Sequence, residues 1–521
     1  MYDLAFDVLI VGSGLSGLVA ACRLVELGVR RVAVASQGAG ATPVIAALNA
    51  SIQPNKWGDT PQQHMLDTLT IGTFVNDEAL VKSMCDDAHR CVNLVESWGV
   101  EFARVDGDYY RRHASGSTYP RSLCQTSEII GVQMYRVLRE WLEERGVTLI
   151  SRATCTDLLC DEGGVTGARL LIDGAPQVIS APIVIAAWGG AGSLLPNSTY
   201  PLDVDGRGIS ILARAGVELR DLEFIEFEPM VSLSPEGAKG EPCPTAMLGE
   251  GAYLLNSKGE RFMLKFRPQG EAGSPKTLMN RAIWEQVSLG NGSPNGGAFV
   301  DLRHIPLEVL KGYPWFYNRL INAGHDPKKE LLEVGPAPHS HSGGAVVDSG
   351  YATRVEGLYA VGEASGGVHG ACRLAGNAAT QALVSGILAA EAIAAKGVRK
   401  AKSPYVSAEL KLNPDARKAG HEWLQALLGR ELGSMRTEAG LTSALADVEE
   451  KLESAEAEQD DLFTQKLEAA RLILVSALAR KESRGGHVRK DYPEVDEAFK
   501  GSVYVEQDDT GAVEYTFRRL S

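Results

Sequence analysis

One loop in the second half of the chain combines a histidine and an arginine ahead of a long apolar stretch. His369 and Arg373 lie four residues apart, and Asn377 stands directly before the apolar segment 378–395. Asparagine is a favoured N-cap residue, so we expect a helix to begin there. The positive end of its dipole would face the loop and stabilise an anionic ring or carboxylate. We predict that His369 and Arg373 bind a substrate carboxylate; the alternative is an ordinary capped helix with a surface arginine.

Two histidines separated by one residue raise the question of a metal site. His339 and His341 are followed by Ser342-Gly343-Gly344. Zinc needs three or four protein ligands, and no third cysteine, histidine or carboxylate stands at a useful spacing nearby. We therefore predict no metal. A histidine at a glycine-flanked strand end, in contact with a bound ring, is the favoured interpretation, with His339 as the candidate catalytic residue.

A glycine-rich turn near the N-terminus has the spacing of a dinucleotide-binding site. A β-branched run at 7–11 precedes Gly12, Gly14 and Gly17, and after a helical pattern a second strand is predicted at 32–34. Gly12 permits the tight turn, Gly14 lets the backbone approach a pyrophosphate, and Gly17 allows close helix–strand packing. A plain glycine turn is the alternative, but the strand that follows favours a dinucleotide.

The residue expected to hold the ribose hydroxyls differs from the usual acid. At the end of the second predicted strand stands Ser36, followed by Gln37, where Asp or Glu is the common choice. A hydroxyl still hydrogen-bonds a ribose, though less strongly than a carboxylate does. We assign both residues to the cofactor site.

Strand-like segments recur later in the chain and predict a domain that is split by an insertion. Residues 183–187 run into a glycine turn at 189–192, and 357–361 precede Gly362-Glu363, whereas 415–482 have helical spacing. The predicted fold is α/β: a Rossmann-like domain interrupted by an α+β capping domain and followed by a C-terminal helical bundle. The expected boundaries are 1–234 and 346–400 for the Rossmann-like domain, 235–345 for the capping or substrate-lid domain, and 401–521 for the helical domain.

The composition is that of a globular protein and excludes several classes of partner. Hydrophobic residues make up 44% of the 521 residues, charged residues make up 23%, and the net charge is −14. An acidic surface repels phosphate backbones, so nucleic acid is not expected as a partner. The cysteines include no Cys-x-x-Cys pair, which predicts reduced thiols and no iron–sulfur or haem site of the chain's own. Polar residues and glycines interrupt both long apolar stretches, so we expect no membrane span.

Four segments together resemble the flavoprotein family of succinate dehydrogenase, fumarate reductase and L-aspartate oxidase: the glycine turn at 12–17, 339–344, 357–374 and 482–493. Segment 357–363 (Gly-Leu-Tyr-Ala-Val-Gly-Glu) is similar to the family's Gly-Leu-x-Ala-x-Gly-Glu, and 369–374 (His-Gly-Ala-Cys-Arg-Leu) to its His-Gly-Ala-Asn-Arg-Leu. Segment 339–344 resembles the family's His-x-x-x-Gly-Gly at the lid junction. Segment 482–487 (Glu-Ser-Arg-Gly-Gly-His) resembles a motif of the branch with a helical C-terminal domain.

The resemblance implies FAD as the cofactor. Glu363 would contact ribose or ribityl hydroxyls, and Asn377 and Ala378 would lie at the pyrimidine edge of the flavin. The segment that follows the Rossmann turn, 41–48, has no histidine for a covalent bond, so we expect noncovalent FAD. Two glycines complete the expected cofactor-binding set: Gly189 and Gly190.

In the predicted lid, the resemblance assigns a catalytic role to one arginine. Arg281 stands at the position of the family's lid arginine, which is credited with delivering a proton to the substrate. A free guanidinium is a poor acid, with a pKa above about 12, so this role requires that it be held against the substrate and reprotonated by a neighbour. A solvated helix arginine is the alternative.

The lid junction departs from the family at a position that bears on the substrate. The family's Gln-x-His-Pro-Thr appears here as Glu226-Phe227-Glu228-Pro229-Met230, which puts an acid where a histidine binds a substrate carboxylate. Like charges about 4 Å apart repel by roughly 1–4 kcal/mol at surface-like dielectric, so Glu228 disfavours the second carboxylate of succinate. A substrate with one carboxylate, or one with a positive group facing Glu228, fits better.

We therefore predict an FAD-dependent oxidoreductase that moves a hydride between flavin and a carbon–carbon bond next to a carboxylate. The alternatives are an amino-acid oxidase like L-aspartate oxidase, and an electron-transferring flavoprotein subunit without its own substrate. Because the chain encodes no iron–sulfur or haem site of its own, an iron–sulfur or other electron-transfer subunit is an expected partner. The expected location is the cytoplasm, or the cytoplasmic face of the membrane through such a partner.

Overall fold

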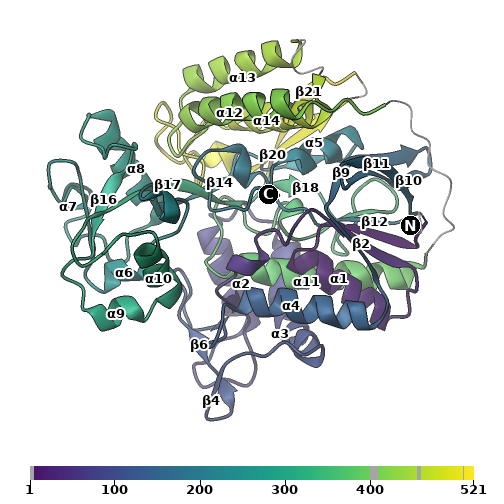
Figure 1. The fold of residues 1–521 in the computed structure, drawn as a ribbon, viewed down its shortest axis with the longest axis horizontal. Helices are drawn as coiled ribbons and strands as arrows, with labels where there is room; N and C mark the ends of the chain where they lie inside the picture. Colours follow the sequence, from purple (N-terminus) through teal and green to yellow (C-terminus); the bar gives the residue numbers. More distant parts are fainter. Residues whose placement is uncertain (1–4, 399–408, 455–458, 509, 521) are drawn as a thin grey trace.

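The computed structural model describes residues 5–398, 409–454, 459–508 and 510–520. A nucleotide-binding domain, a lid domain at one side and a group of C-terminal helices at the top make up the molecule (Figure 1). This arrangement confirms the α/β fold with a capping domain and C-terminal helices. The boundary predicted at 400/401 lies outside the described residues.

The nucleotide-binding domain is built on a parallel sheet with the strand order β19-β12-β1-β2-β8. Its strands are β1 (Val8–Val11), β2 (Val32–Ser36), β8 (Thr148–Ser151), β12 (Val184–Ala186) and β19 (Leu358–Ala360). Every residue of β1 is buried, as expected for a central parallel strand that is covered on both faces. β19 follows the lid in sequence yet pairs with β12, so the domain resumes after the insertion.

Helices from both halves of the chain belong to this domain: α1 (Leu15–Glu26), α2 (Pro61–Ile71), α3 (Glu78–Ser97), α4 (Ile130–Glu144) and α11 (Asn377–Lys396). α11 packs against α1 and α3, and a Cβ on Gly386 would lie only 2.3 Å from the carbonyl oxygen of Ser16. By length and composition α11 is apolar enough to cross a membrane, but 61% of its most apolar stretch is buried inside the protein. Its apolar side chains therefore serve the core.

Smaller sheets complete the domain. β9 (Ala153–Asp161), β10 (Gly164–Ile172) and β11 (Ala175–Ser180) form an antiparallel sheet. The remaining short strands are β3 (Leu48–Asn49), β4 (Arg104–Val105), β5 (Asp108–Tyr109), β6 (Arg111–Arg112) and β7 (Ser122–Leu123). One further helix, α5 (Arg207–Arg214), packs against α14 (Asp461–Ala479) of the C-terminal region.

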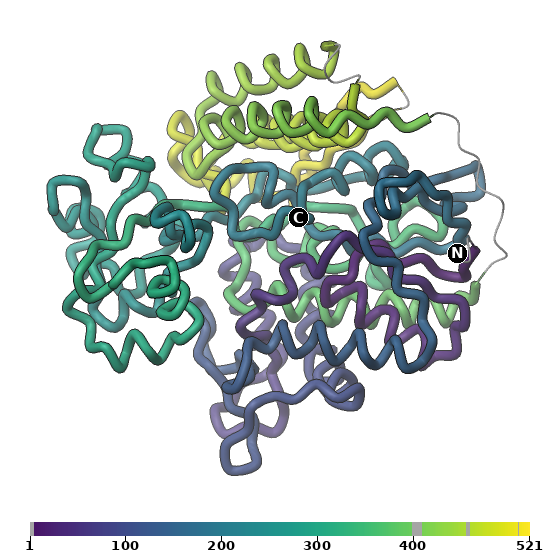
Figure 2. The backbone as a smooth tube through the Cα atoms, in the orientation of Figure 1, coloured from purple at the N-terminus to yellow at the C-terminus, as the bar shows by residue number. Residues whose placement is uncertain are grey.

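The lid forms a lobe of its own, drawn in teal to one side of the tube in Figure 2. Its sheet has the order β14-β17-β16-β15, formed by β14 (Ile225–Ser232), β15 (Tyr253–Leu255), β16 (Ala298–Asp301) and β17 (Leu332–His341). Its helices are α6 (Ala246–Gly249), α7 (Met263–Phe266), α8 (Lys276–Ser288), α9 (Leu307–Lys311) and α10 (Pro314–Asn322). The chain enters through β14 and returns through the antiparallel β17, so the lid sheet begins ahead of the predicted boundary at 235.

The C-terminal region contains the predicted helices and also a pair of strands. The helices are α12 (Pro414–Glu431), α13 (Glu438–Leu452) and α14. β20 (Gly501–Gln507) and β21 (Val513–Arg519) then form an antiparallel pair that joins β13 (Leu219–Arg220) and β18 (Gly344–Ala345) in one sheet. The expectation of a purely helical region over 401–521 missed this pair. Its signal was the alternating buried residues Val503 and Val505.

A buried ion-pair network ties the C-terminal region to the strand that enters the lid. Arg480 donates to Glu223 Oε1 at 2.6 Å and to Glu482 Oε1 at 2.9 Å, and the side chains of all three residues are 0% exposed. Arg480 also donates to the backbone carbonyls of Phe499 and Gly501. The network therefore joins the end of α14, the start of β20 and the residues directly before β14.

Arg480→Met should destabilise the protein strongly, because it leaves the carboxylate of Glu223 buried without its cation, whereas Glu482 keeps its ion pair with Arg484. Removal of one partner of a buried pair costs about 3–5 kcal/mol, which urea unfolding followed by circular dichroism would measure as a lower midpoint. Lys82→Met is the matched control, because its ion pair with Asp86 is exposed and its loss should leave the midpoint in place. An Arg480→Met protein with the wild-type midpoint would contradict the role of the network.

Candidate functional site

The glycine turn after β1 forms a cradle at the start of α1. Gly12 has φ 116°, and a Cβ there would lie 2.2 Å from the carbonyl oxygen of Ala187. A Cβ on Gly17 would lie 2.0 Å from the carbonyl oxygen of Gly12, so neither position accepts a side chain. α1 begins after Gly14, which has no side chain to cap the helix, and the N–H of Leu15 donates to Thr42 Oγ1 at 2.7 Å. The other amides of the first turn are available to a phosphate, which fits the pyrophosphate of a dinucleotide.

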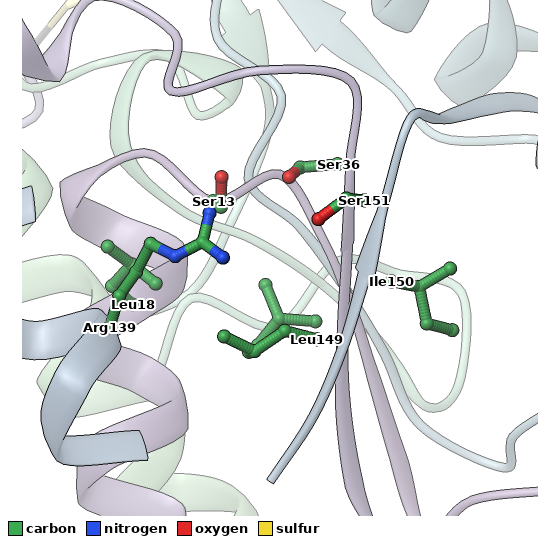
Figure 3. A pocket seen from close by; sticks show the side chains of 8 residues that line it. Ser13, Leu18, Ser36, Arg139, Leu149, Ile150 and Ser151 are labelled. Atoms are coloured by element: carbon green, nitrogen blue, oxygen red, sulfur yellow. The ribbon is translucent and has the colours of Figure 1, made fainter. Parts of the chain in front are cut away.

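A small pocket lies at the end of β2, where a ribose is expected. Three serine hydroxyls and a guanidinium face it in Figure 3, from Ser13, Ser36, Ser151 and Arg139. Hydroxyl and guanidinium groups suit sugar hydroxyls and phosphate oxygens. Sequence reasoning found Ser36 but missed Arg139, because α4 brings it from about a hundred residues away. Gln37 instead accepts a hydrogen bond from Thr154 at 3.1 Å, so its side chain is held by β9.

Glu363 lies half-buried between two of the predicted segments. Its Oε1 accepts from the backbone N–H of His341 at 2.9 Å and from the hydroxyl of Tyr200, and its Oε2 accepts from the N–H of Gly190 at 3.1 Å. Burial raises the pKa of the Glu363 carboxyl against these hydrogen bonds. The carboxylate thus fixes the turn at Gly189-Gly190 to the end of β17. Its contact with ribose or ribityl hydroxyls stays a prediction.

The start of α11 corrects one sequence-based expectation. The N-cap is Gly376, with φ 91°, and Asn377 is the first helical residue. The Asn377 amide cannot cap the helix, because its oxygen meets His64 Nε2 and Asn49 Nδ2, both at 2.8 Å. No side chain of the described residues caps α11, and Ala378 in its first turn is exposed. The positive helix end is therefore open to a ligand, as the pyrimidine edge of a flavin requires.

Arg373 lies in the loop before α11 and points toward the lid junction. It is 9% exposed; its Nε donates to Ser340 Oγ at 3.1 Å and its Nη2 to Glu226 Oε1 at 3.3 Å. His369 in the same loop is buried, and its Nδ1 has no hydrogen-bond partner among the described residues. His339 on β17 meets Thr199 Oγ1 through Nδ1 at 3.0 Å.

The cation that the lid contributes is a lysine. Lys276, at the first position of α8, places its Nζ 2.8 Å from Glu226 Oε1 and 2.8 Å from Glu228 Oε2. The two glutamates share a face of β14 because they are two residues apart. One turn along α8, Asn280 donates to the carbonyl of Phe227 at 2.9 Å and holds the helix against that strand. Sequence reasoning missed Lys276, although it stands five residues before the expected arginine.

The structure places Arg281 away from this cluster. It is exposed on α8 and makes no hydrogen bond or ion pair with the part of the chain that is described. Five helical residues turn the side chain by about 140° relative to Lys276, so the two cannot face the same site. The catalytic role expected for Arg281 stays a prediction, and the α8 cation that lies beside Arg373 in this structure is Lys276.

Burial and charge set the protonation of the cluster at neutral pH. Burial works against the charged forms, but Lys276 and Arg373 hold the pKa of Glu226 well below its ordinary value. The glutamates likewise raise the pKa of Lys276 above its ordinary value, against the effect of burial. Burial and the two nearby cations lower the pKa of His339 to about 4, and burial and Arg373 lower that of His369 to about 3. Both histidines are therefore neutral.

Glu226, Glu228 and His339 could in principle hold a metal ion, since their ligand atoms lie within 4.8 Å of one another. The ammonium of Lys276 bridges the two carboxylates and supplies the positive charge there. A metal would have to displace that ammonium, so this donor set is better described as part of an organic-substrate site.

The C-terminal motif at 482–487 packs against the site. The N–H of Gly486 donates to the carbonyl of Ala371 at 2.8 Å, and a Cβ on Gly486 would lie 2.6 Å from the carbonyl of Ile225. Gly485, with φ 53°, also approaches Ala371 closely. Beside it, a small cavity lined by Lys276, Cys372 and Gly486, among others, lies where the three regions meet. The motif therefore supports both the arginine loop and β14.

Comparisons with known proteins agree with this geometry. Residues 7–379 match the family described as "FAD binding domain", and residues 461–521 match "Fumarate reductase flavoprotein C-term". The chain is 32% identical to one of the subunits of the fumarate reductase (CoM/CoB) of Methanothermobacter marburgensis, over 95% of this chain and 96% of that protein. It is also 32% identical to an L-aspartate oxidase of Caulobacter vibrioides, over 95% of each chain.

Solved structures share the whole fold. "Quinol-Fumarate Reductase with Menaquinol Molecules" has a TM-score of 0.88 and 25% identity over 100% of this chain and 99% of that one. "Mycobacterium smegmatis Sdh1 in complex with UQ1" has a TM-score of 0.87 and 29% identity over 99% and 94%. The glycine cradle at the start of α1 and the open end of α11 fit FAD, and the matched family is described as an FAD binding domain. The chain is an FAD-dependent oxidoreductase and belongs to the flavoprotein family of succinate dehydrogenase, fumarate reductase and L-aspartate oxidase.

Proposed function

We propose that this chain oxidises or reduces a carbon–carbon bond next to the carboxylate of a small substrate bound between Arg373 and Lys276. The observation that carries the proposal is the convergence of these two cations, from the α11 loop and the lid, on the same glutamate. Bound FAD would supply the hydride acceptor or donor. The open end of α11, which starts at Asn377 and so lies close to Arg373 along the chain, fits a flavin beside the substrate.

Arg373 is suited to hold the substrate carboxylate. A guanidinium binds a carboxylate through two parallel hydrogen bonds, and here its Nε is already oriented by Ser340 Oγ. The longer contact of Nη2 with Glu226, at 3.3 Å, is the one that a substrate would replace. As negative charge develops next to the carboxylate in the transition state, the fixed guanidinium stabilises it.

Lys276 is suited to carry the proton that accompanies hydride transfer. An isolated ammonium releases a proton more readily than a guanidinium, but Glu226 and Glu228 raise the pKa of Lys276 and so reduce this difference. Glu226 and Glu228 keep Nζ protonated, because they raise its pKa. In the reductive direction Nζ would give its proton to the carbon next to the carboxylate, and in the oxidative direction it would receive it.

The electrons require a partner outside this chain. Two solved relatives are described with a quinone or a quinol, UQ1 in one and menaquinol in the other. We infer that an electron-transfer subunit connects the flavin of this chain to such a carrier, and an iron–sulfur protein is the first candidate. The intact Arg373–Glu226–Lys276 cluster favours a working substrate site over a flavoprotein subunit without one.

Amino-acid oxidation with oxygen is a second candidate. It is favoured by Glu228, which could accept an ammonium group, and by L-aspartate oxidases among the relatives. The products and the electron donor that the enzyme uses distinguish the two candidate functions. An oxidase produces hydrogen peroxide from an amino acid in air, whereas a reductase consumes reduced viologen under anaerobic conditions when an unsaturated acid is added.

Lys276→Met should lower the rate constant of flavin oxidation by an unsaturated acid about 10²–10⁴-fold, the usual contribution of a general acid. Stopped-flow oxidation of the reduced enzyme measures this directly. Arg281→Met is the matched control on the same helix, and it should keep the wild-type rate constant because Arg281 is exposed and turned away. Equal losses in both variants, or a loss only in Arg281→Met, would restore the arginine as the proton donor.

The dependence of kcat/KM on pH should show no change between pH 6 and 8 that is due to protonation of a histidine. The pKa of His339 is lowered to about 4, so the ring becomes protonated only as the pH falls toward that value. Plots of kcat/KM against pH should therefore be flat with respect to His339 across this range. A limb near pH 6.5 that His339→Asn abolishes would show that the histidine titrates in its ordinary range.

A further inference from the structure

The charges at the lid junction cancel before any substrate is bound. Glu226 and Glu228 carry the negative charges, and Lys276 and Arg373 carry the positive ones. His339 remains neutral, because its pKa is about 4. Glu363 also lies within electrostatic reach of Arg373, but its oxygens accept from Tyr200, His341 and Gly190 on the cofactor side.

The balance of charges at the lid junction matters because the charged side chains are largely buried. Glu226 and Glu228 are buried, Arg373 is 9% exposed, and the Lys276 side chain is 25% exposed. Uncompensated charge in such surroundings is costly, because neither water nor salt screens it well. A ligand without net charge leaves the cluster balanced, whereas a dicarboxylate adds two negative charges to it.

The positions of the charges also divide the site into two ends. Arg373 contacts Glu226 and comes from outside the lid, so a carboxylate is favoured at this end. Glu228 contacts Lys276 at the other end, beside His339. A second carboxylate would there face an acid, while a cationic nitrogen would find an acceptor.

We infer that the substrate of this site is a small zwitterion, with one carboxylate on Arg373 and an ammonium group received by Glu228. This inference rests on the proposed function, since it assigns the substrate class to the same site. Glu228 is then the residue that determines specificity. It rejects dicarboxylates through charge repulsion and accepts the ammonium, while Lys276 retains Glu226 as its partner.

Three unsaturated acids of the same carbon skeleton test the inference: trans-4-aminocrotonate, a zwitterion; crotonate, with one carboxylate; and fumarate, with two. Their dissociation constants are measured by titration of the oxidised holoenzyme, through the change in flavin absorbance. 4-Aminocrotonate should bind at least about tenfold more tightly than fumarate, because like charges at a buried contact are strongly disfavoured. Crotonate should fall between them.

Glu228→Gln should abolish the preference for 4-aminocrotonate over fumarate. The substitution removes the carboxylate and leaves the cluster with a net positive charge, which favours fumarate. Glu308→Gln, in the exposed first turn of α9, is the matched control and should keep the wild-type order. FAD content and the unfolding midpoint show that each variant is folded. Fumarate binding as tightly as 4-aminocrotonate to the wild type, a preference unchanged in Glu228→Gln, or no binding of any acid would overturn the inference.

Turnover distinguishes this inference from the proposed function. Reduced enzyme that is oxidised by none of the three acids, while the binding order holds, would remove the proposed reaction and support the charge-based selection. Oxidation by fumarate with tight fumarate binding would support the reaction and overturn the zwitterion.

Discussion

Two glutamates of β14 can be buried at the lid junction because a lysine from α8 and an arginine from the α11 loop neutralise them. Removal of Lys276 would leave the buried carboxylate of Glu228 without its cation. The ion pairs also cross the junction between the lid and the nucleotide-binding domain. The same contacts therefore set the charge of the junction and hold the lid against the nucleotide-binding domain.

Besides the charged side chains, the uncapped start of α11 presents the positive end of its helix dipole at this place. It remains uncapped because Gly376 adopts a left-handed conformation and Asn377 bonds to His64 and Asn49 instead of the helix amides. An asparagine that usually caps a helix here connects α11 to α2 and β3. The helix dipole is then available to an anionic cofactor ring, and the neighbouring Arg373 is available to a substrate.

The C-terminal region contributes to the site by packing against the two segments that carry Arg373 and Glu226. Gly485 and Gly486 pack against the carbonyls of Ala371 and Ile225, which belong to the arginine loop and the start of β14. The ion pair of Arg480 with Glu223 anchors the same strand. A region far along the sequence thus holds the two segments whose separation decides whether Arg373 can reach Glu226.

The sequence by itself determined the features that depend on neighbours along the chain. The glycine turn at 12–17, the strand–turn pattern before Glu363 and the helical composition of 415–482 are local signals, and the structure confirms the elements they predict. Arg373 and His339 could be proposed as candidate site residues because each stands inside a short, recognisable motif. Glu228 could be singled out because it replaces a residue within such a motif.

Only the tertiary structure decided which cation faces these residues. Lys276 and Arg281 stand on the same helix with similar charge, and the sequence offered no measure of which side α8 turns toward β14. Asn280 settles it by bonding to the carbonyl of Phe227, a contact between residues 53 positions apart. Arg139 reaches the pocket at the end of β2, and β20 joins β13, through similarly distant contacts. Such pairings depend on how buried surfaces and charges match across the fold, and no local pattern records that match.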